Sequence, residues 1–210
     1  NSQEAYDYFG LEAVSAKSIT DAFPEDNGDI VLEVNSNGGL VTVGSEIYTA
    51  LKSYSGNVTV EVTGMAASAA SVAIMGADKV LISPTAQIMI HKALYGYVSG
   101  NSDDLDKASN ALKSSDQAII NAYVAKTGLS EEEILDMMRN ETYMSASEAV
   151  EKGFADEVMS FDDVGAVASL ENGLLPQAVI DDFYANRSKR KSEIQNMLRE
   201  IEKEELLRGL

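Results

Sequence analysis

Two side chains in this sequence have the chemistry of a nucleophile and the base that activates it. Ser68 lies in the run "GMAASAAS", residues 64–71, whose small side chains leave its hydroxyl uncrowded. His91 is the only histidine and ends the apolar run 86–91. A serine hydroxyl is a weak nucleophile near pH 7 until a base within hydrogen-bond reach accepts its proton. The pair therefore indicates acyl transfer, although small residues are also typical of close helix packing and a lone histidine is often structural.

Backbone N–H groups near this pair could stabilise the oxyanion of an acyl transfer. If Ser68 begins a helix after a strand, the N–H group of Ala69 is free to donate to a substrate. The run "NSNGG", residues 35–39, follows another predicted strand, and glycine lets a backbone N–H group come close to a substrate. Taken alone, Asn-Gly-Gly is more typical of an ordinary turn.

These residues need an alternation of strands and helices to bring them together, and the hydrophobic pattern predicts one. The run 30–34 is apolar on both faces, as in a buried parallel strand. Capping boxes of Ser130 with Glu133 and of Ser145 with Glu148 predict two helix starts. The predicted strands are 30–34, 57–63, 79–84 and 86–91, and the predicted helices are 15–22, 40–54, 65–77, 103–126, 130–140 and 145–153, with an extended loop or edge strand at 93–101. This order is typical of an α/β fold with mostly parallel strands, whose strand ends line an open crevice.

The charge and composition narrow the classes of partner and chemistry. The chain has 210 residues, a formal net charge of −18 and 45% hydrophobic residues, enough for a substantial core. Such an acidic chain is a poor partner for nucleic acid or an anionic membrane. The absence of cysteine excludes disulfides, thiol nucleophiles and thiolate metal sites, and it fits a reducing compartment. No apolar run is long enough to span a bilayer, and no Gly-x-x-x-x-Gly-Lys phosphate loop occurs.

The last part of the chain differs in charge from the rest. Residues 186–210 carry seven Lys or Arg and five Glu, a net positive charge in an otherwise acidic chain. We therefore predict a main domain at 1–165 and a C-terminal helical extension at 166–210. The extension is either a solvated helix end or disordered tail, or a helix that binds a partner.

Several motifs, in their order and spacing, resemble the ClpP family of serine peptidases (peptidase S14). They are "NSNGG" with "VGSEIY", then "GMAASAAS", "IMIHKA" and "SASEAVEKGFADEV". The resemblance covers about residues 30–158. It implies a ClpP/crotonase-like fold of repeated strand-strand-helix units with a mostly parallel sheet. It also implies peptide-bond hydrolysis without a metal or an organic cofactor.

The resemblance assigns Ser68 as the nucleophile and His91 as the general base. The family has an aspartate as the third member of its catalytic triad, and this chain has Glu141 at that position. A glutamate can orient an imidazole as an aspartate does. Asp136 and Asp156 are the alternatives for this role.

The same resemblance implies the binding groups around the triad. The N–H groups of Gly39 and Ala69 would form the oxyanion hole. Gly38, Leu94 and Gly96 would contact the substrate. The glycine-rich segment around Leu94 would offer an edge to which an extended peptide adds as a strand.

Members of the family stack into rings that enclose a proteolytic chamber, and an ATPase ring feeds unfolded chain into it. The resemblance therefore implies a homo-oligomeric ring, with the helix at 103–126 between rings. Asn37, Glu141 and the long tail resemble more closely the ClpP-like proteases of phages and prophages, which process capsid or scaffold proteins during head assembly. We expect a protein substrate and a Clp ATPase or a capsid or scaffold partner, in the bacterial cytoplasm or in a phage prohead within the host cell.

Two other functions stay open. A crotonase-type enzyme that acts on acyl-CoA shares the fold and a similar pair of N–H donors. Basic residues for the CoA phosphates would be expected there, and this chain is strongly acidic. A non-catalytic assembly protein is the other alternative, against which the intact serine and histidine argue.

Overall fold

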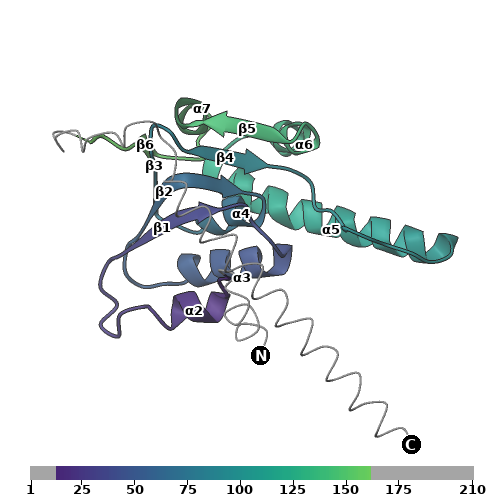
Figure 1. The fold of residues 1–210 in the computed structure, drawn as a ribbon, viewed down its shortest axis with the longest axis horizontal. Coiled ribbons are helices and arrows are strands. Elements are labelled where there is room, and N and C mark those ends of the chain that lie inside the picture. The colour runs from purple at the N-terminus through teal and green to yellow at the C-terminus, as the bar shows by residue number, and fades with distance from the viewer. Residues whose placement is uncertain (1–12, 162–210) are drawn as a thin grey trace, which may run out of the picture. The chain divides into compact units, whose positions relative to one another are not determined.

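The fold is built on a six-stranded sheet in the order β5-β4-β2-β3-β6, with β1 also paired to β2 (Figure 1). The computed structural model describes residues 13–161. The strands are β1 (Ile30–Ser36), β2 (Val58–Ala67), β3 (Lys79–Ile82), β4 (Gln87–Ile90), β5 (Thr142–Ser145) and β6 (Glu157–Val158). The helices are α2 (Ala16–Thr20), α3 (Val41–Lys52), α4 (Ala69–Ile74), α5 (Ser102–Thr127), α6 (Glu131–Arg139) and α7 (Ala146–Glu151). The predicted α/β class with mostly parallel strands is confirmed, and β5 pairs antiparallel with β4.

Strand β2 is the centre of the sheet because it pairs along both edges. Strand β1 takes one edge, with Ile30 opposite Val58. The other edge is divided, since β3 lies beside residues 59–62 and β4 lies beside residues 65–67. All three neighbours run parallel to β2. The carboxyl end of β4 therefore comes level with the carboxyl end of β2.

The inward side chains of the sheet form the core. Val58, Val60 and Val62 of β2 are fully buried. The prediction that β1 is buried on both faces is wrong, because Val31 is 64% exposed and Glu33 is also exposed. Successive strand residues point to opposite faces, and only one face of β1 packs against the core.

The predicted helix at 65–77 is wrong in its first turn. Strand β2 continues to Ala67, and α4 is correspondingly short. Residues 65–67 pair with β4, and Ala66 also pairs with Ser36 of β1. Pairing along both edges overrides the weak local preference of these small residues. The short strands β5 and β6 were not predicted, whereas the remaining strands and helices lie close to their predicted ranges.

Glycines let α3 and α4 pack very closely. A Cβ atom on Gly44 of α3 would lie 2.5 Å from the carbonyl oxygen of Ala69. A Cβ atom on Gly76 would lie 2.4 Å from the carbonyl oxygen of Tyr48. Both neighbours are backbone atoms, which move only if the helices move. Small residues in this region therefore serve close helix packing as well as access to Ser68.

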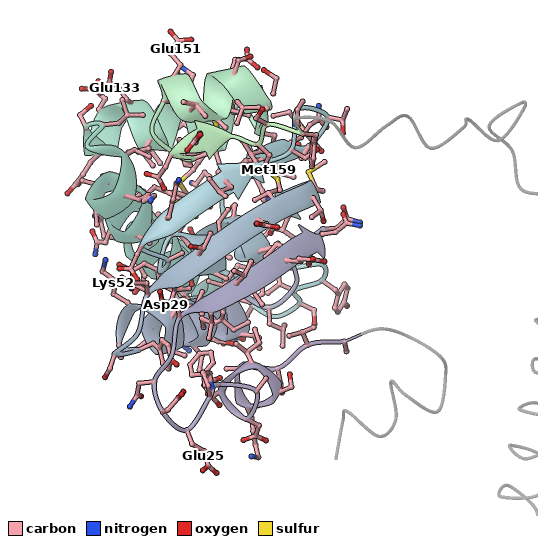
Figure 2. The ribbon with its side chains drawn as sticks, turned by 90° about the vertical axis from the view of Figure 1, so that its left-hand side faces the viewer. Glu25, Asp29, Lys52, Glu133, Glu151 and Met159 are labelled. Carbon is pink, nitrogen blue, oxygen red and sulfur yellow. The ribbon has the colours of Figure 1, made fainter. Side chains whose placement is uncertain are left out.

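Both predicted capping boxes are confirmed. Ser130 accepts from the N–H group of Glu133, and Ser145 does the same for Glu148, while each glutamate reaches back to its serine. The hydroxyl and N–H groups of Ser145 hold the pKa of Glu148 below its usual value, since both hydrogen bonds favour the carboxylate. Figure 2 shows Glu133 of α6 and Glu151 of α7 at the outer surface.

Helix α5 extends well past the sheet, and the segment after β4 runs beside its projecting part (Figure 1). The buried residues of α5 lie between Asp116 and Tyr123, in its second half. The segment 93–101 forms no strand, so of the two predicted forms the structure has the extended loop. Large apolar side chains are exposed around the projecting part, namely Tyr95, Tyr97, Val98 and Leu105.

The predicted domain boundary near residue 165 and the predicted helical extension at 166–210 lie outside the described residues. Between residues 13 and 161, no helix has the combination of length and apolar character that crossing a membrane requires.

Gly44→Ala should destabilise the fold by about 1–3 kcal/mol, because the added Cβ overlaps the carbonyl of Ala69 and pushes α3 away from α4. Gly96→Ala is the control, since a Cβ there meets nothing within 4 Å and should change the unfolding free energy by less than about 0.5 kcal/mol. Urea denaturation followed by circular dichroism measures both. Equal stability of Gly44→Ala and the parental chain would contradict the close packing.

Candidate active site

Ser68 occupies a sharp turn between β2 and α4. Its backbone has φ 56° and ψ −126°, a conformation that costs a non-glycine residue roughly 1–3 kcal/mol. Its N–H group donates to the carbonyl of Met89 at 2.9 Å, and its carbonyl accepts from the N–H group of Ser71 at 3.0 Å. A strained strand-to-helix turn of this kind is one way in which α/β enzymes expose a nucleophilic serine.

The turn at 35–39 lies against Ser68, and this contact requires glycine. Gly38 has φ 93°, and a Cβ atom on it would lie 2.7 Å from Cβ of Ser68 and 2.6 Å from the carbonyl oxygen of Ala67. At Gly39, by contrast, an added Cβ would meet open space. The small residues around Ser68 thus admit a second stretch of backbone, which brings Gly39 into the same cavity as Ser68.

His91 follows the end of β4, and its ring reaches Ser68. Nε2 of His91 lies 2.7 Å from Oγ of Ser68. Both side chains are half-buried. For Nε2 to accept the hydroxyl hydrogen, the neutral ring must carry its own proton on Nδ1. The structure therefore brings together the two residues that the sequence singled out, in a geometry suited to proton transfer.

Glu141 and His91 adjoin the same end of the β4–β5 pair but are not bonded to each other. Thr142 of β5 is opposite Ile90 of β4, and Glu141 and His91 are the residues next to this last pair on their two chains. Glu141 has φ 48° and an exposed side chain. Within residues 13–161, its carboxylate has no hydrogen bond or ion pair, and the ring of His91 has none besides that to Ser68.

The two alternative acids have other partners. Asp156 accepts from the N–H group of Val80 at the start of β3, at 2.6 Å. Asp136 accepts from the side-chain amide of Asn140 on α6, at 3.3 Å. Neither carboxylate is hydrogen-bonded to His91 in the described residues.

Two residues whose backbone N–H groups are unpaired in the described structure line the same cavity as Ser68. Gly39 and Ala69 line a cavity of about 120 Å³ that Ser68 and His91 also line. In the described part of the chain, neither N–H group has an acceptor. Ala69 is the first residue of α4, where N–H groups have no partner within the helix. Attack on a carbonyl requires a hydroxyl, a base and oxyanion donors, and the residues that line this cavity carry groups of all three kinds.

The rest of the cavity wall is mostly apolar. Of the three residues predicted to contact substrate, Leu94 lines the cavity, and Gly38 and Gly96 are not among its lining residues. Residues 13–161 contain no group of three or more His, Asp or Glu side chains arranged to hold a metal ion. The apolar lining comes from α3, α4 and α5, through Val41, Val72, Ile119 and Tyr123.

Comparison with known proteins decides the family. The family model described as Clp protease matches residues 17–162, more than half of the chain. The chain belongs to the Clp protease family. The mostly parallel α/β sheet described above is consistent with the fold of that family.

Its relatives include bacterial proteolytic subunits. The ATP-dependent Clp protease proteolytic subunit 1 of Chlamydia trachomatis serovar D is 34% identical over 168 residues, covering 74% of this chain and 88% of the relative. The subunit 1 of Chlamydia muridarum is 37% identical over 139 residues, covering 64% and 72%. The subunit 2 of Tropheryma whipplei is 27% identical over 157 residues, covering 74% and 87%.

This Clp protease chain has a buried pair of hydroxyls beneath the Ser68 turn, which sequence analysis missed. Oγ of Ser71 donates to the carbonyl of Ser68 at 2.6 Å and lies 2.8 Å from the hydroxyl of Tyr123. Because the Ser71 hydrogen points to Ser68, Tyr123 is the donor to Ser71. Burial raises the pKa of Tyr123, so its hydroxyl keeps the proton that this bond needs. The second serine of "GMAASAAS" was visible in the sequence, but its partner on α5 was not.

Ser71→Ala should destabilise this Clp protease chain by about 1–3 kcal/mol, because the buried hydroxyl of Tyr123 loses its acceptor. Adding Tyr123→Phe to that variant should recover much of the loss, since no buried hydroxyl is then left unpaired. A double-mutant cycle by urea denaturation measures the coupling. If the losses of unfolding free energy in the two single variants simply add in the double variant, the two hydroxyls do not interact.

Proposed function

We propose that this chain is a serine endopeptidase that hydrolyses peptide bonds with Ser68 and His91. The observation that carries the proposal is the 2.7 Å separation of Nε2 from Oγ at a strained turn, in a chain of the Clp protease family. A base at this distance can take the hydroxyl proton as the oxygen attacks a carbonyl. The family match favours this chemistry over the crotonase-type alternative.

The proposed reaction has two halves. Oγ of Ser68 attacks the carbonyl carbon while His91 takes its proton, and the N–H groups of Gly39 and Ala69 bind the resulting oxyanion. His91 then gives the proton to the leaving amine as the C–N bond breaks, which leaves an acyl ester on Ser68. A water molecule, deprotonated by His91, hydrolyses the ester and restores Ser68.

Glu141 is proposed as the acid that orients His91. The register of β4 and β5 supports this role, since Glu141 and His91 both adjoin its last pair, Thr142 and Ile90. Its exposed side chain is free to turn toward the ring. A carboxylate at Nδ1 would fix the tautomer in which Nε2 accepts the serine proton, and it would stabilise the imidazolium that forms.

The proposed substrate is a polypeptide with an apolar side chain next to the cleaved bond. The mostly apolar cavity beside Ser68 supports this choice. The peptide would continue along the segment that contains Leu94 and Gly96 and pass Gly38. That segment pairs with no strand in the described residues, so an extended peptide could add to it through backbone hydrogen bonds.

The chain is further proposed to act as a homo-oligomeric ring supplied by a Clp ATPase in the bacterial cytoplasm. The relatives named as proteolytic subunits of an ATP-dependent protease support this arrangement. The exposed apolar side chains of Tyr95, Tyr97 and Leu105 support it as well, because such groups are often covered by a partner subunit. The absence of cysteine fits a reducing compartment.

Processing of phage capsid or scaffold proteins is the second candidate. Asn37 and Glu141 favour it, because at these positions the sequence resembles the ClpP-like proteases of phages and prophages. ATP-dependent degradation of unfolded protein with an added Clp ATPase would support the first candidate. Cleavage of a capsid or scaffold protein without an ATPase would support the second.

Ser68→Ala should lower kcat for peptide hydrolysis by at least about 10³-fold, because the variant lacks the hydroxyl that forms the proposed acyl ester. The native mass and the circular dichroism spectrum should stay at their parental values. A fluorogenic peptide with an apolar residue before the cleaved bond serves as substrate. A parental rate in Ser68→Ala would show that another group is the nucleophile.

Glu141→Gln should lower kcat at least about tenfold, since an amide stabilises the imidazolium less well than a carboxylate does. Asp136→Asn, which changes a carboxylate on α6 bonded to Asn140, is the matched control and should keep the parental kcat. The same peptide assay compares the two variants. Equal rates for Glu141→Gln and the control would assign the orienting role to another group.

A further inference from the structure

We propose that Asp116 is a positioning residue for this active site. From α5 it holds the segment that follows His91, and it thereby fixes the imidazole beside Ser68. The effect of Asp116 on turnover rests on the proposed function. Its effect on the position of His91 does not, and can be measured without any activity.

The carboxylate of Asp116 is buried and binds two consecutive residues. Its Oδ1 accepts from the N–H group of Ala93 at 2.8 Å, and its Oδ2 pairs with Nζ of Lys92 at 3.0 Å. The side chain of Asp116 is 7% exposed, whereas that of Lys92 is 43% exposed. A buried carboxylate needs such partners, and removing them leaves a costly unpaired charge.

These bonds act where the strand no longer holds the chain. Strand β4 ends at Ile90, one residue before His91. In the described structure, the bond from Ala93 to Asp116 is the one hydrogen bond that a backbone group of residues 92–94 makes. The direction in which the chain leaves β4 therefore depends on Asp116, and that direction sets where the ring of His91 lies.

Asp116 also joins two of the segments that line the cavity. Lys92 and Ala93, which follow His91, line the cavity, and so do Ile119 and Tyr123 of α5. Asp116 is on the same helix as the second pair and binds the first pair directly. The position of these two segments relative to each other and the position of the base thus depend on the same carboxylate.

A second aspartate, whose side chain is 40% exposed, provides a control with the same kinds of partner. Asp156 accepts from a backbone N–H group, that of Val80, at 2.6 Å and pairs with Nζ of Lys126 at 2.7 Å. It therefore has the same two kinds of partner as Asp116.

The two aspartates act at different levels of the sheet. Val80 lies opposite Val60 of β2, whereas Met89, just before the end of β4, lies opposite Ala67. Because β2 is irregular between Val62 and Ala66, where its four residues span two residues of β1, these levels are about five strand rises, or roughly 17 Å, apart. Substitutions at Asp156 should therefore cost stability without moving His91.

The first readout is the ¹³Cε1–¹H NMR signal of histidine, which is unambiguous because His91 is the only histidine in the chain. Asp116→Asn keeps an oxygen that can accept from Ala93 but loses the charge, and Asp116→Ala loses both. We expect the His91 signal to shift or broaden in both variants, and more in Asp116→Ala. In Asp156→Asn and Asp156→Ala the signal should stay at its parental position.

The second readout is hydrolysis of a fluorogenic peptide. In Asp116→Ala, kcat should fall at least about tenfold with a smaller change in KM, because a misplaced base slows the chemical step more than binding. In Asp116→Asn, kcat should lie between the parental and Asp116→Ala values. The Asp156 variants should lose thermal stability and keep the parental kcat.

The outcomes separate this inference from the proposed function. If both Asp116 variants keep the parental His91 signal and kcat, the positioning role is wrong. If Asp116→Ala does not fold, Asp116→Asn decides by the same criteria. If the parental chain hydrolyses no peptide, the proposed function fails, and the His91 signal alone decides. An unchanged signal then overturns the positioning role, and a shift absent from the Asp156 variants supports it.

Discussion

The hydrogen bond between Ser68 and His91 depends on how one edge of β2 is divided between β3 and β4. Because β4 pairs with the last residues of β2, the ends of these two strands lie level, and the N–H group of Ser68 bonds to the carbonyl of Met89. The hydroxyl of Ser68 then follows the end of β2, and the imidazole of His91 follows the end of β4. A slip of one residue in this register would turn His91 to the opposite face of the sheet.

The same strand end holds Ser68 in a conformation that costs roughly 1–3 kcal/mol. Its carbonyl accepts from the N–H group and the hydroxyl of Ser71, and Tyr123 in turn donates to Ser71. Each such bond contributes about 0.5–1.5 kcal/mol, so a few of them offset the strain. Gly38 lies close against the other side of the turn, where no larger residue fits. The serine is therefore fixed by its surroundings on several sides, which keeps its hydroxyl directed at the base.

The parts of the fold that sequence could predict are those set by local pattern. The capping boxes at Ser130 and Ser145 mark helix starts through residues three apart, and they appear where expected. The alternation of predicted strands and helices was sufficient to predict the α/β class. Ser68 and His91 could be singled out because one lies among small residues and the other is unique.

The parts that sequence could not predict depend on contacts between distant segments. Residues 65–67 read as helix because they are small, and only pairing with β1 and β4 makes them a strand. Asp116 looks like any polar residue of an amphipathic helix, and its burial is visible only when Lys92 and Ala93 lie against it. That Glu141 and His91 adjoin the same end of a strand pair likewise follows only from the antiparallel pairing of β4 with β5.

Reaction with a fluorophosphonate tests the central claim most directly, because this reagent forms a stable covalent bond only with an activated serine. Peptide mass spectrometry of the labelled chain should find the adduct on Ser68. His91→Ala should slow the labelling at least about 100-fold, since the hydroxyl then lacks its base. Labelling of His91→Ala at the parental rate, or an adduct on another serine with Ser68 unmodified, would contradict the account.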